Sequence, residues 1–125
     1  MTENEISKVL VEIFLKVHRE LGPGLLESVY EEAICHELAK RNIPFTRQEG
    51  INVMYDGAKM EMGFRAEIIV ENKVIIELKS VEVIAPVHPK ILLTYLRLTK
   101  LKLGLLVNFN VPLIKDGISR IVNNL

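Results

Sequence analysis

The chain has 125 residues, of which 49% are hydrophobic and 26% are charged, and its formal net charge at pH 7 is zero. This length is typical of one domain with a substantial core, and the composition excludes a disordered chain. Because 16 basic residues balance 16 acidic ones, no global electric field draws the protein onto nucleic acid or a membrane. We therefore expect residues 1–125 to form a single domain.

The sequence also limits the cellular setting. Cys35 is the only cysteine, which excludes an intrachain disulfide. The first five residues are polar and acidic, unlike a secretory signal. No apolar run approaches the roughly 18 to 20 residues needed to span a bilayer. These features predict a cytoplasmic protein with no membrane partner.

Two helices are predicted in the first third of the chain. Apolar residues recur at helical spacing up to Leu21, and Gly22 then ends a helix that begins near Thr2 or Asn4. A second helix is expected over residues 25–41, before an Asn and a Pro. Its buried face is expected to comprise Leu26, Val29, Tyr30, Ala33, Ile34 and Leu38.

Three strands are predicted next, over residues 45–55, 59–70 and 73–80. Asp56-Gly57 is a strong signal for a two-residue hairpin turn between the first two. Strict alternation along the second strand divides its side chains between two faces. One face is expected to hold Met60, Met62, Phe64, Ala66, Ile68 and Val70, and the other Glu61, Gly63, Arg65 and Glu67.

The last third of the chain predicts a helix between two strands. The helix begins near His88 and Pro89 and ends near Lys100, with His88 as a cap or surface residue. Residues 103–109 are almost all apolar and predict a strand buried on both faces. A turn at Asp116-Gly117 precedes an edge strand over residues 118–122. The resulting α-α-β-β-β-α-β-β order predicts an α/β fold, with a mixed sheet covered by helices.

Three ionisable residues stand in the two apolar strands of residues 63–79. Glu77 and Lys79 are two apart and must point to the same side of their strand. A hairpin through residues 71–72 places Glu67 beside them. Two carboxylates and an ammonium are costly to bury unpaired, and binding of a hard divalent cation explains them. A structural ion-pair cluster on an exposed sheet face explains them equally well.

The predicted third helix has both basic and apolar features. Lys90, Arg97 and Lys100 lie roughly on one helical face, where they either contact a nucleic-acid backbone or form an ordinary solvated surface. The helix is apolar on too many sides for a simple surface helix, which favours a homo-oligomer interface. The apolar residues concerned are Ile91, Leu92, Leu93, Tyr95, Leu96 and Leu98.

Nearly the whole chain resembles a known family. Gly24-Leu25-Leu26-Glu27-Ser28-Val29-Tyr30 matches the motif of the GxxExxY proteins, and the match continues at Glu77-Leu78-Lys79 and at Leu106-Val107-Asn108-Phe109. These proteins are similar to the PD-(D/E)xK nucleases. The resemblance implies a restriction-endonuclease-like αβββαβ core, here with an extra N-terminal helix and a short C-terminal strand.

The resemblance also implies a set of site residues. Glu67 stands where the family has Asp, and Glu77 and Lys79 take the remaining motif positions. Together with the backbone carbonyl of Leu78, the two acids are expected to hold Mg²⁺ or Mn²⁺. Glu27 is expected to be a further metal ligand or to support one. Tyr30 is expected to pack over the site or contact the substrate.

Two functions follow from the resemblance. The first is a metal-dependent nuclease or phosphodiesterase that hydrolyses nucleic acid. The second is a catalytically weakened module that binds nucleic acid or a protein partner, with or without homo-oligomerisation. Two differences favour the second function. Glu67 is one methylene longer than the family's Asp, and Ile91 cannot form the hydrogen bonds of the Gln often found at its position.

Overall fold

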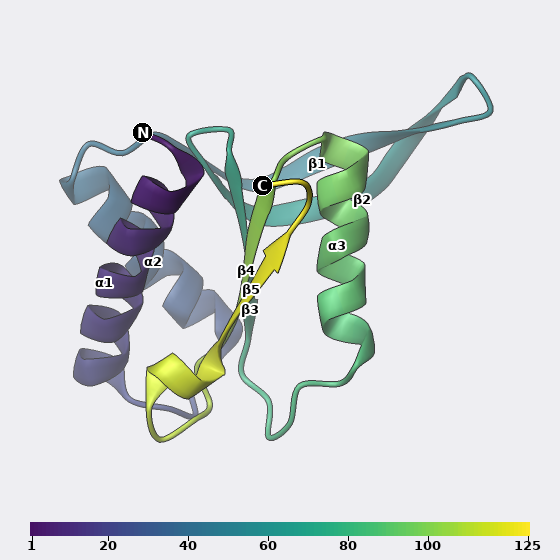
Figure 1. The fold of residues 1–125 in the computed structure, drawn as a ribbon. Coiled ribbons are helices and arrows are strands. Elements are labelled where there is room, and N and C mark those ends of the chain that lie inside the picture. The colour runs from purple at the N-terminus through teal and green to yellow at the C-terminus, as the bar shows by residue number, and fades with distance from the viewer.

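The protein folds into three layers, which Figure 1 shows with the sheet nearly edge-on. A computed structural model describes residues 1–125. Helices α1 (Glu3–Leu21) and α2 (Glu27–Lys40) cover one face of the sheet, and α3 (Val87–Thr99) covers the other. None of the helices combines the length and apolar character that a membrane crossing needs. The expected mixed sheet covered by helices is confirmed, and the helices lie on both of its faces.

Local sequence signals set the ends of the first two helices. Thr2 caps α1 and exchanges side-chain and backbone hydrogen bonds with Glu5, as in a capping box. Gly22 ends α1 with φ 73°, a left-handed conformation that glycine adopts without strain. The predicted burial of Leu26 and Val29 is wrong, since their exposed fractions are 75% and 38%. Leu26 precedes the first turn of α2 and therefore does not share its buried face.

The sheet has five strands in the order β1-β2-β3-β4-β5. The β3–β4 pair is parallel, joined through α3, and every other pair is antiparallel. A short 3₁₀ helix precedes β5, which lies at the edge of the sheet as predicted. The bounds are Phe45–Tyr55 for β1, Ala58–Val70 for β2, Val74–Lys79 for β3, Leu103–Asn108 for β4, Ile114–Gly117 for the 3₁₀ helix and Ile118–Val122 for β5.

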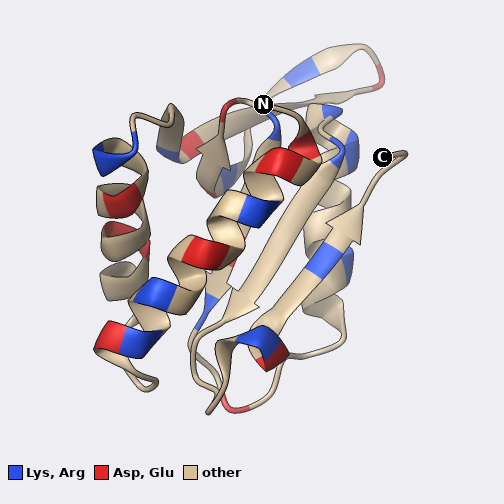
Figure 2. Cartoon of the chain, turned by 60° about the vertical axis from the view of Figure 1, so that its left-hand side comes forward, with Lys and Arg blue, Asp and Glu red and all other residues tan.

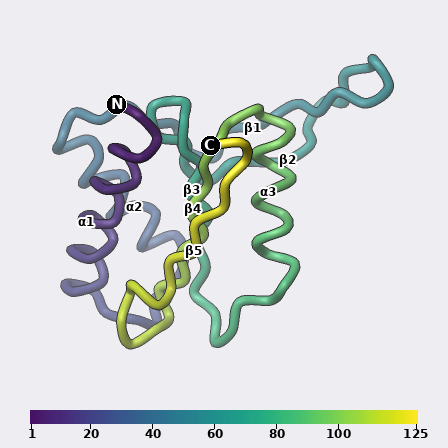
Figure 3. Tube along the Cα trace, in the orientation of Figure 1, coloured from purple at the N-terminus to yellow at the C-terminus, as the bar shows by residue number.

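The β1–β2 hairpin continues past the sheet as an arm, which Figure 3 shows extending away from the body of the protein. Its outer side chains are exposed, with fractions of 62% for Met54, 72% for Tyr55 and 58% for Met62. The strict alternation predicted for β2 is wrong. Ala66 packs in the core beneath α3, whereas Ile68 packs in the core beneath α1 and α2.

Two hydrophobic cores hold the layers together. The larger has 19 buried residues and lies between the sheet and the α1–α2 pair; the smaller has six and lies beneath α3. All six residues of β4 are buried, as predicted for a central strand. A Cβ at Gly104 in β4 would lie 2.8 Å from Leu92, so glycine permits the close approach of α3 to the sheet.

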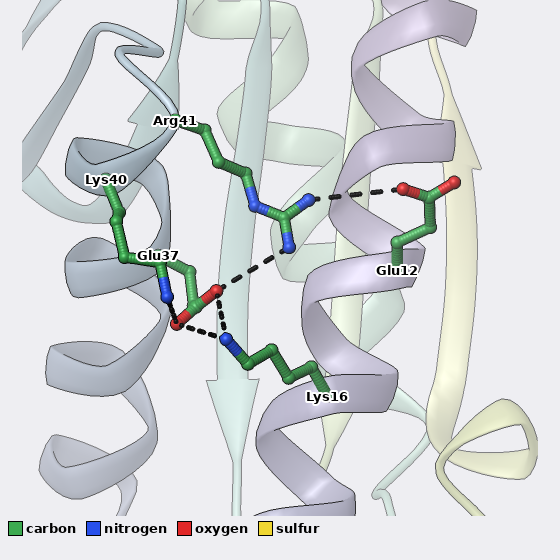
Figure 4. A network of polar contacts seen from close by, with 5 residues as sticks. All are labelled: Glu12, Lys16, Glu37, Lys40 and Arg41. Carbon is green, nitrogen blue, oxygen red and sulfur yellow. Dashed lines mark hydrogen bonds and ion pairs between the residues drawn. The ribbon is translucent and has the colours of Figure 1, made fainter.

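Charged residues lie mainly on the helices and at the ends of the sheet. Figure 2 shows acidic and basic segments interspersed along α1, with largely uncharged strands behind it. The α1–α2 surface carries an ion network around Glu37, drawn in Figure 4. The Glu37 side chain is 8% exposed, and its oxygens lie 3.1 Å from Lys16 Nζ, 3.5 Å from Lys40 Nζ and 3.5 Å from Arg41 Nη2. The network therefore ties the two helices together.

We expect Glu37→Gln to lower the free energy of unfolding by about 1 to 2 kcal/mol, because three cations lose their common partner. Urea denaturation measures the change. Glu12→Gln is the control, since Glu12 is 59% exposed and meets Arg41 only at 4.0 Å. It should cost less than about 0.5 kcal/mol. Equal costs for the two variants would contradict a stabilising role for Glu37.

Candidate active site

The pairing of β2 with β3 stops just before the acidic residues. Backbone pairing runs from Val70↔Val74 to Ile68↔Ile76 and no further, although β3 continues to Lys79. On the other side of β2, Gln48 in β1 faces Glu67 with φ 50°, and this pair is missing between Arg47↔Ile68 and Glu49↔Ala66. The irregularity turns the chain at Glu67 and accounts for the broken alternation of β2.

Two carboxylates occupy the gap between β2 and β3. Glu67 Oε2 accepts a hydrogen bond from the Leu78 backbone N at 3.3 Å. Glu77 Oε1 accepts one from the Glu67 backbone N at 3.5 Å. Each acid therefore replaces a missing ladder partner of the opposite strand. The predicted approach of Glu67 to Glu77 is present in the structure.

The closeness of the two acids changes how they ionise. Burial, hydrogen bonding with Glu77 and repulsion from its charge raise the pKa of Glu67 to about 9. Burial also raises the pKa of Glu77, although hydrogen bonds from Glu67 and the charge of Lys79 oppose the rise. Near neutral pH the pair therefore retains a proton in the absence of a cation.

Lys79 lies at the end of β3, on the same side as Glu77, and its position is fixed by the strand that follows. In β4, Asn108 is the register partner of Lys79. The Asn108 side chain accepts a hydrogen bond from Val81 N at 3.1 Å and donates one to Val81 O at 2.9 Å. No ion pair in the structure includes Lys79, Glu67 or Glu77. This absence argues against a purely structural ion-pair cluster.

A cavity of about 110 Å³ opens between β3 and α3 beside this group. Glu77 and Lys79 line it from β3, and His88, Ile91 and Tyr95 line it from α3. Ile91 thus lies at the site, as the resemblance implied, and brings no hydrogen-bonding group. The Tyr95 ring stacks on Phe64 of β2, with centroids 3.8 Å apart, and forms a wall of the site.

Two of these cavity residues were not identified as functional from the sequence. His88 was expected to be a cap or surface residue, but it lines the cavity, and its Nδ1 is buried without a hydrogen-bond partner. Tyr95 was assigned to the apolar helix alone. Because His88 and Tyr95 lie three residues before and four after Ile91, helical spacing from Ile91 identifies both.

Glu27 lies in the first turn of α2, on the opposite side of the sheet from α3. Its charge contributes to the raised pKa values of both Glu67 and Glu77. No cluster of three or more His, Cys, Asp or Glu side chains capable of holding a metal is present, so Glu27 does not complete a three-carboxylate group. Its predicted role, as a further metal ligand or as support for one, stays a prediction.

The predicted contact of Tyr30 with substrate is wrong. Tyr30 has no exposed surface, and its ring stacks on Phe109 with centroids 4.3 Å apart. Its hydroxyl donates to Gly22 O at 2.6 Å and accepts from Leu25 N at 3.1 Å. Tyr30 therefore anchors the turn between α1 and α2 within the core.

The basic residues of the third helix differ in position. Lys90 and Arg97 are exposed on α3, while Lys100 follows the helix as its C-cap with φ 63°. None of the three lines the cavity. A contact with a nucleic-acid backbone remains a prediction for all three.

The donor set suits a small hard cation. Two carboxylates lie side by side, and their pKa values are raised because burial outweighs the hydrogen bonds and the charge of Lys79 that favour ionisation. Mg²⁺ in proteins is bound through one or two carboxylates and keeps several waters, so a third acidic side chain is not required. Glu67 and Glu77 therefore fit Mg²⁺ or Mn²⁺.

We expect Glu67→Gln to stabilise the metal-free protein by about 1 to 2 kcal/mol at pH 8, because an amide has no charge to bury. The folded pKa of Glu67, about 9, exceeds its ordinary value of 4.5. Below pH 4.5 Glu67 is protonated in both the folded and the unfolded chain, and the stability of the wild type is fully present. As the pH rises toward 9, only the unfolded chain ionises freely, and this stability is lost.

Calorimetric unfolding in chelator between pH 5 and pH 9 measures this effect. The advantage of Glu67→Gln over wild type should grow with pH. Glu61→Gln, which changes an exposed glutamate on the same strand, should follow the wild-type profile. An advantage that stays constant with pH would contradict the raised pKa of Glu67.

Comparison with known proteins agrees with this geometry. No curated protein and no solved structure shows significant similarity to the chain. The model of the PD-(D/E)XK nuclease superfamily matches residues 4–121, a span that includes the β2–β3 gap, the Glu77-Leu78-Lys79 segment and α3. The narrower GxxExxY resemblance stays a prediction. Because the match covers nearly the whole chain, the protein belongs to the PD-(D/E)XK nuclease superfamily.

Proposed function

We propose that the protein is a divalent-metal-dependent nuclease that hydrolyses phosphodiester bonds in nucleic acid. The observation that supports this most directly is the meeting of Glu67 and Glu77 in the gap between β2 and β3, with Lys79 on the same side of β3 as Glu77. Membership of the nuclease superfamily supports the reaction class. The presence of two partly buried acids at the point where the ladder opens is difficult to explain by stability alone.

Each residue has a distinct part in this proposal. Glu67 and Glu77, with the Leu78 carbonyl, hold the metal. When bound, Mg²⁺ or Mn²⁺ supplies a Lewis acid for the phosphate and a water of lowered pKa. Lys79 orients the phosphate and stabilises the charge that develops on its oxygens. Phe109 N donates to Lys79 O at 2.9 Å, and the Asn108–Val81 hydrogen bonds hold the segment that follows Lys79. Phe64 with Tyr95 shields one side of the site.

The substrate reaches the site along α3 in this proposal. Lys90 and Arg97 are exposed on the helix that forms one wall of the cavity, and Lys100 follows the same helix. These cations contact backbone phosphates on either side of the reacting one, which adds affinity without sequence preference. We propose no choice between DNA and RNA, since no residue of the site distinguishes the two sugars.

A non-catalytic binding module is the second candidate, and Ile91 is the observation that favours it. Ile91 borders the cavity with an apolar side chain and cannot help to orient a water or a phosphate. Homo-oligomerisation is compatible with both candidates. Leu92 and Leu96 are used in the core beneath α3. Val87, Ile91 and Leu98, which are 52%, 38% and 42% exposed, form the apolar surface of α3 available for a partner.

We expect Glu77→Ala to weaken Mn²⁺ and Mg²⁺ binding by at least about tenfold, which corresponds to about 1.4 kcal/mol. Titration calorimetry measures the affinity. Near pH 7 the binding should also release a proton from the acidic pair, since the pKa of Glu67 is about 9. Glu61→Ala should bind like wild type. Unchanged binding in Glu77→Ala would place the metal elsewhere.

We expect Lys79→Ala to reduce cleavage of a nucleic-acid substrate by about 10² to 10³-fold while metal affinity is kept, because Lys79 acts on developing charge. A fluorescent-strand cleavage assay with Mn²⁺ measures the rate. Lys59→Ala, which changes a lysine on the hairpin arm, is the matched control. Salt-dependent binding without any turnover in the wild type would favour the binding module instead.

A further inference from the structure

The hairpin arm, formed by residues 52–63, has an apolar face that the rest of the protein does not cover. In the register of β1 with β2, Val53 pairs with Met60 and Tyr55 with Ala58, so these four side chains share one face of the arm. Tyr55 and Met60 are exposed there, and Figure 3 shows the arm extending clear of the helices. A two-stranded ribbon alone is only marginally stable in water, and packing against another surface stabilises it. The arm therefore suits contact with a partner.

Helix α3 carries a second apolar surface that remains uncovered. Val87, Ile91 and Leu98 are exposed, and their spacing of four and seven residues places them in one stripe along the helix. Leu92 and Leu96 form the buried face of the same helix and pack in the small core. The exposed stripe, called the α3 stripe below, is therefore not needed to hold α3 on the sheet.

The arm and the α3 stripe match in length. From Ala58 to Gly63, β2 is about 20 Å long at 3.3 Å per residue. The stripe from Val87 to Leu98 is about 17 Å long at 1.5 Å per residue. The apolar face of one arm can therefore cover the whole stripe when the two lie side by side.

Opposite charges border the two apolar surfaces. On the arm, Asp56 and Glu61 outnumber the single Lys59, whereas α3 contains Lys90 and Arg97 and no acidic residue. All five charged side chains are exposed, and none forms an ion pair in the structure. Contact of the arm with α3 brings charges of opposite sign together. Contact of two arms, or of two α3 helices, brings together surfaces of the same sign, which electrostatic complementarity disfavours.

We propose that two copies of the protein exchange their arms, so that the arm of each copy lies along the α3 stripe of the other. Figure 1 shows the arm pointing away from the α3 helix of its own chain, so the contact has to come from another copy. A two-fold axis forms the contact twice and closes the assembly as a dimer. Each contact then needs to bury only about half of the roughly 1,200 to 2,000 Å² of a stable interface.

The exchanged arm lies beside the candidate active site. Ile91 belongs to the α3 stripe and also lines the cavity between β3 and α3, so the arm of the second copy borders that cavity. The arm also covers the surface near Lys90 and Arg97, and nucleic acid therefore competes with it for α3. The inference concerns only the contact between two copies and does not depend on the nuclease proposal.

The test begins with sedimentation of the full chain at about 1 to 100 μM, a range that detects micromolar association. A reversible dimer with twice the 14.2 kDa mass of the chain is expected. The arm variant, which combines Tyr55→Ser with Met60→Ser, and the α3 variant Leu98→Gln should each weaken dimerisation by about tenfold or more, because each alters an apolar anchor in both contacts.

Leu15→Gln is the matched control, since Leu15 is a leucine on α1 whose exposure, 41%, is close to that of Leu98. It should leave the dimer unchanged. Circular dichroism checks that every variant keeps the fold, as substitution of exposed residues should allow. A wild-type protein that remains at 14.2 kDa over the whole range, or a loss of dimer in Leu15→Gln equal to that in Leu98→Gln, overturns the proposal.

Mixing the variants separates arm exchange from simpler dimers. In an exchanged dimer, the arm variant and Leu98→Gln together form a heterodimer that keeps one intact contact, between the arm of the Leu98→Gln chain and the α3 stripe of the arm variant. The mixture should therefore associate more tightly than either variant alone. A dimer weakened by only one of the two variants, or a mixture no tighter than its components, overturns the exchange.

The results also separate this inference from the nuclease proposal. If the dimer depends on both surfaces while Mn²⁺ does not bind and no nucleic acid is cleaved, the arm exchange stands and the nuclease proposal fails. If a protein that stays monomeric cleaves nucleic acid, the nuclease proposal stands and the arm exchange is wrong.

Discussion

The rest of the site depends on the point where β2 and β3 stop pairing. Beyond Ile68↔Ile76 the backbone amides of Glu67 and Leu78 have no ladder partner, and carboxylates from the opposite strands accept their hydrogen bonds. Because both carboxylates take the place of backbone carbonyls in the same gap, the two acids come together in a partly buried space. The raised pKa values of Glu67 and Glu77 are therefore a direct consequence of how the sheet opens.

Side-chain contacts from helix α2 stabilise the irregular part of β1 next to this opening. Glu31 on α2 is 6% exposed and receives hydrogen bonds from Arg47 Nη2 and Gln48 Nε2, both at 2.7 Å. Gln48 is the left-handed residue of β1 that faces Glu67, and its carbonyl accepts a hydrogen bond from Arg65. A buried carboxylate on α2 therefore fixes the irregularity in β1, and that irregularity turns Glu67 toward β3.

Local signals made most helices and strands predictable from the sequence. The side-chain alternation of β2 was not predictable, because the β1–β2 pairing is irregular at Gln48 and Glu67. Asp56-Gly57, Gly22 and the apolar run of β4 mark their elements without tertiary information. Alternation failed at Glu67, because the irregularity lies opposite Gln48, whose side chain is bound by Glu31 of α2, and no periodicity reveals that contact. His88 and Tyr95 were missed because Ile91 alone was assigned to the cavity from the third helix, although the face of α3 that carries all three lines it. Tyr30 lies on the buried face expected from its spacing, and the expected substrate contact was wrong because motif membership does not distinguish a core anchor from a substrate contact.

The two hydrophobic cores differ in size and in what they border. The large core beneath α1 and α2 holds 19 buried residues, and each fully buried Leu or Ile contributes about 1.5 to 3 kcal/mol. The small core beneath α3 holds six and borders the cavity and the acidic pair. The uncompensated acids and the unpaired His88 nitrogen both lie on the side with little packing to offset them. Their cost is tolerated because the opposite face supplies most of the stability, and a cation bound by the two acids would stabilise the weaker face most.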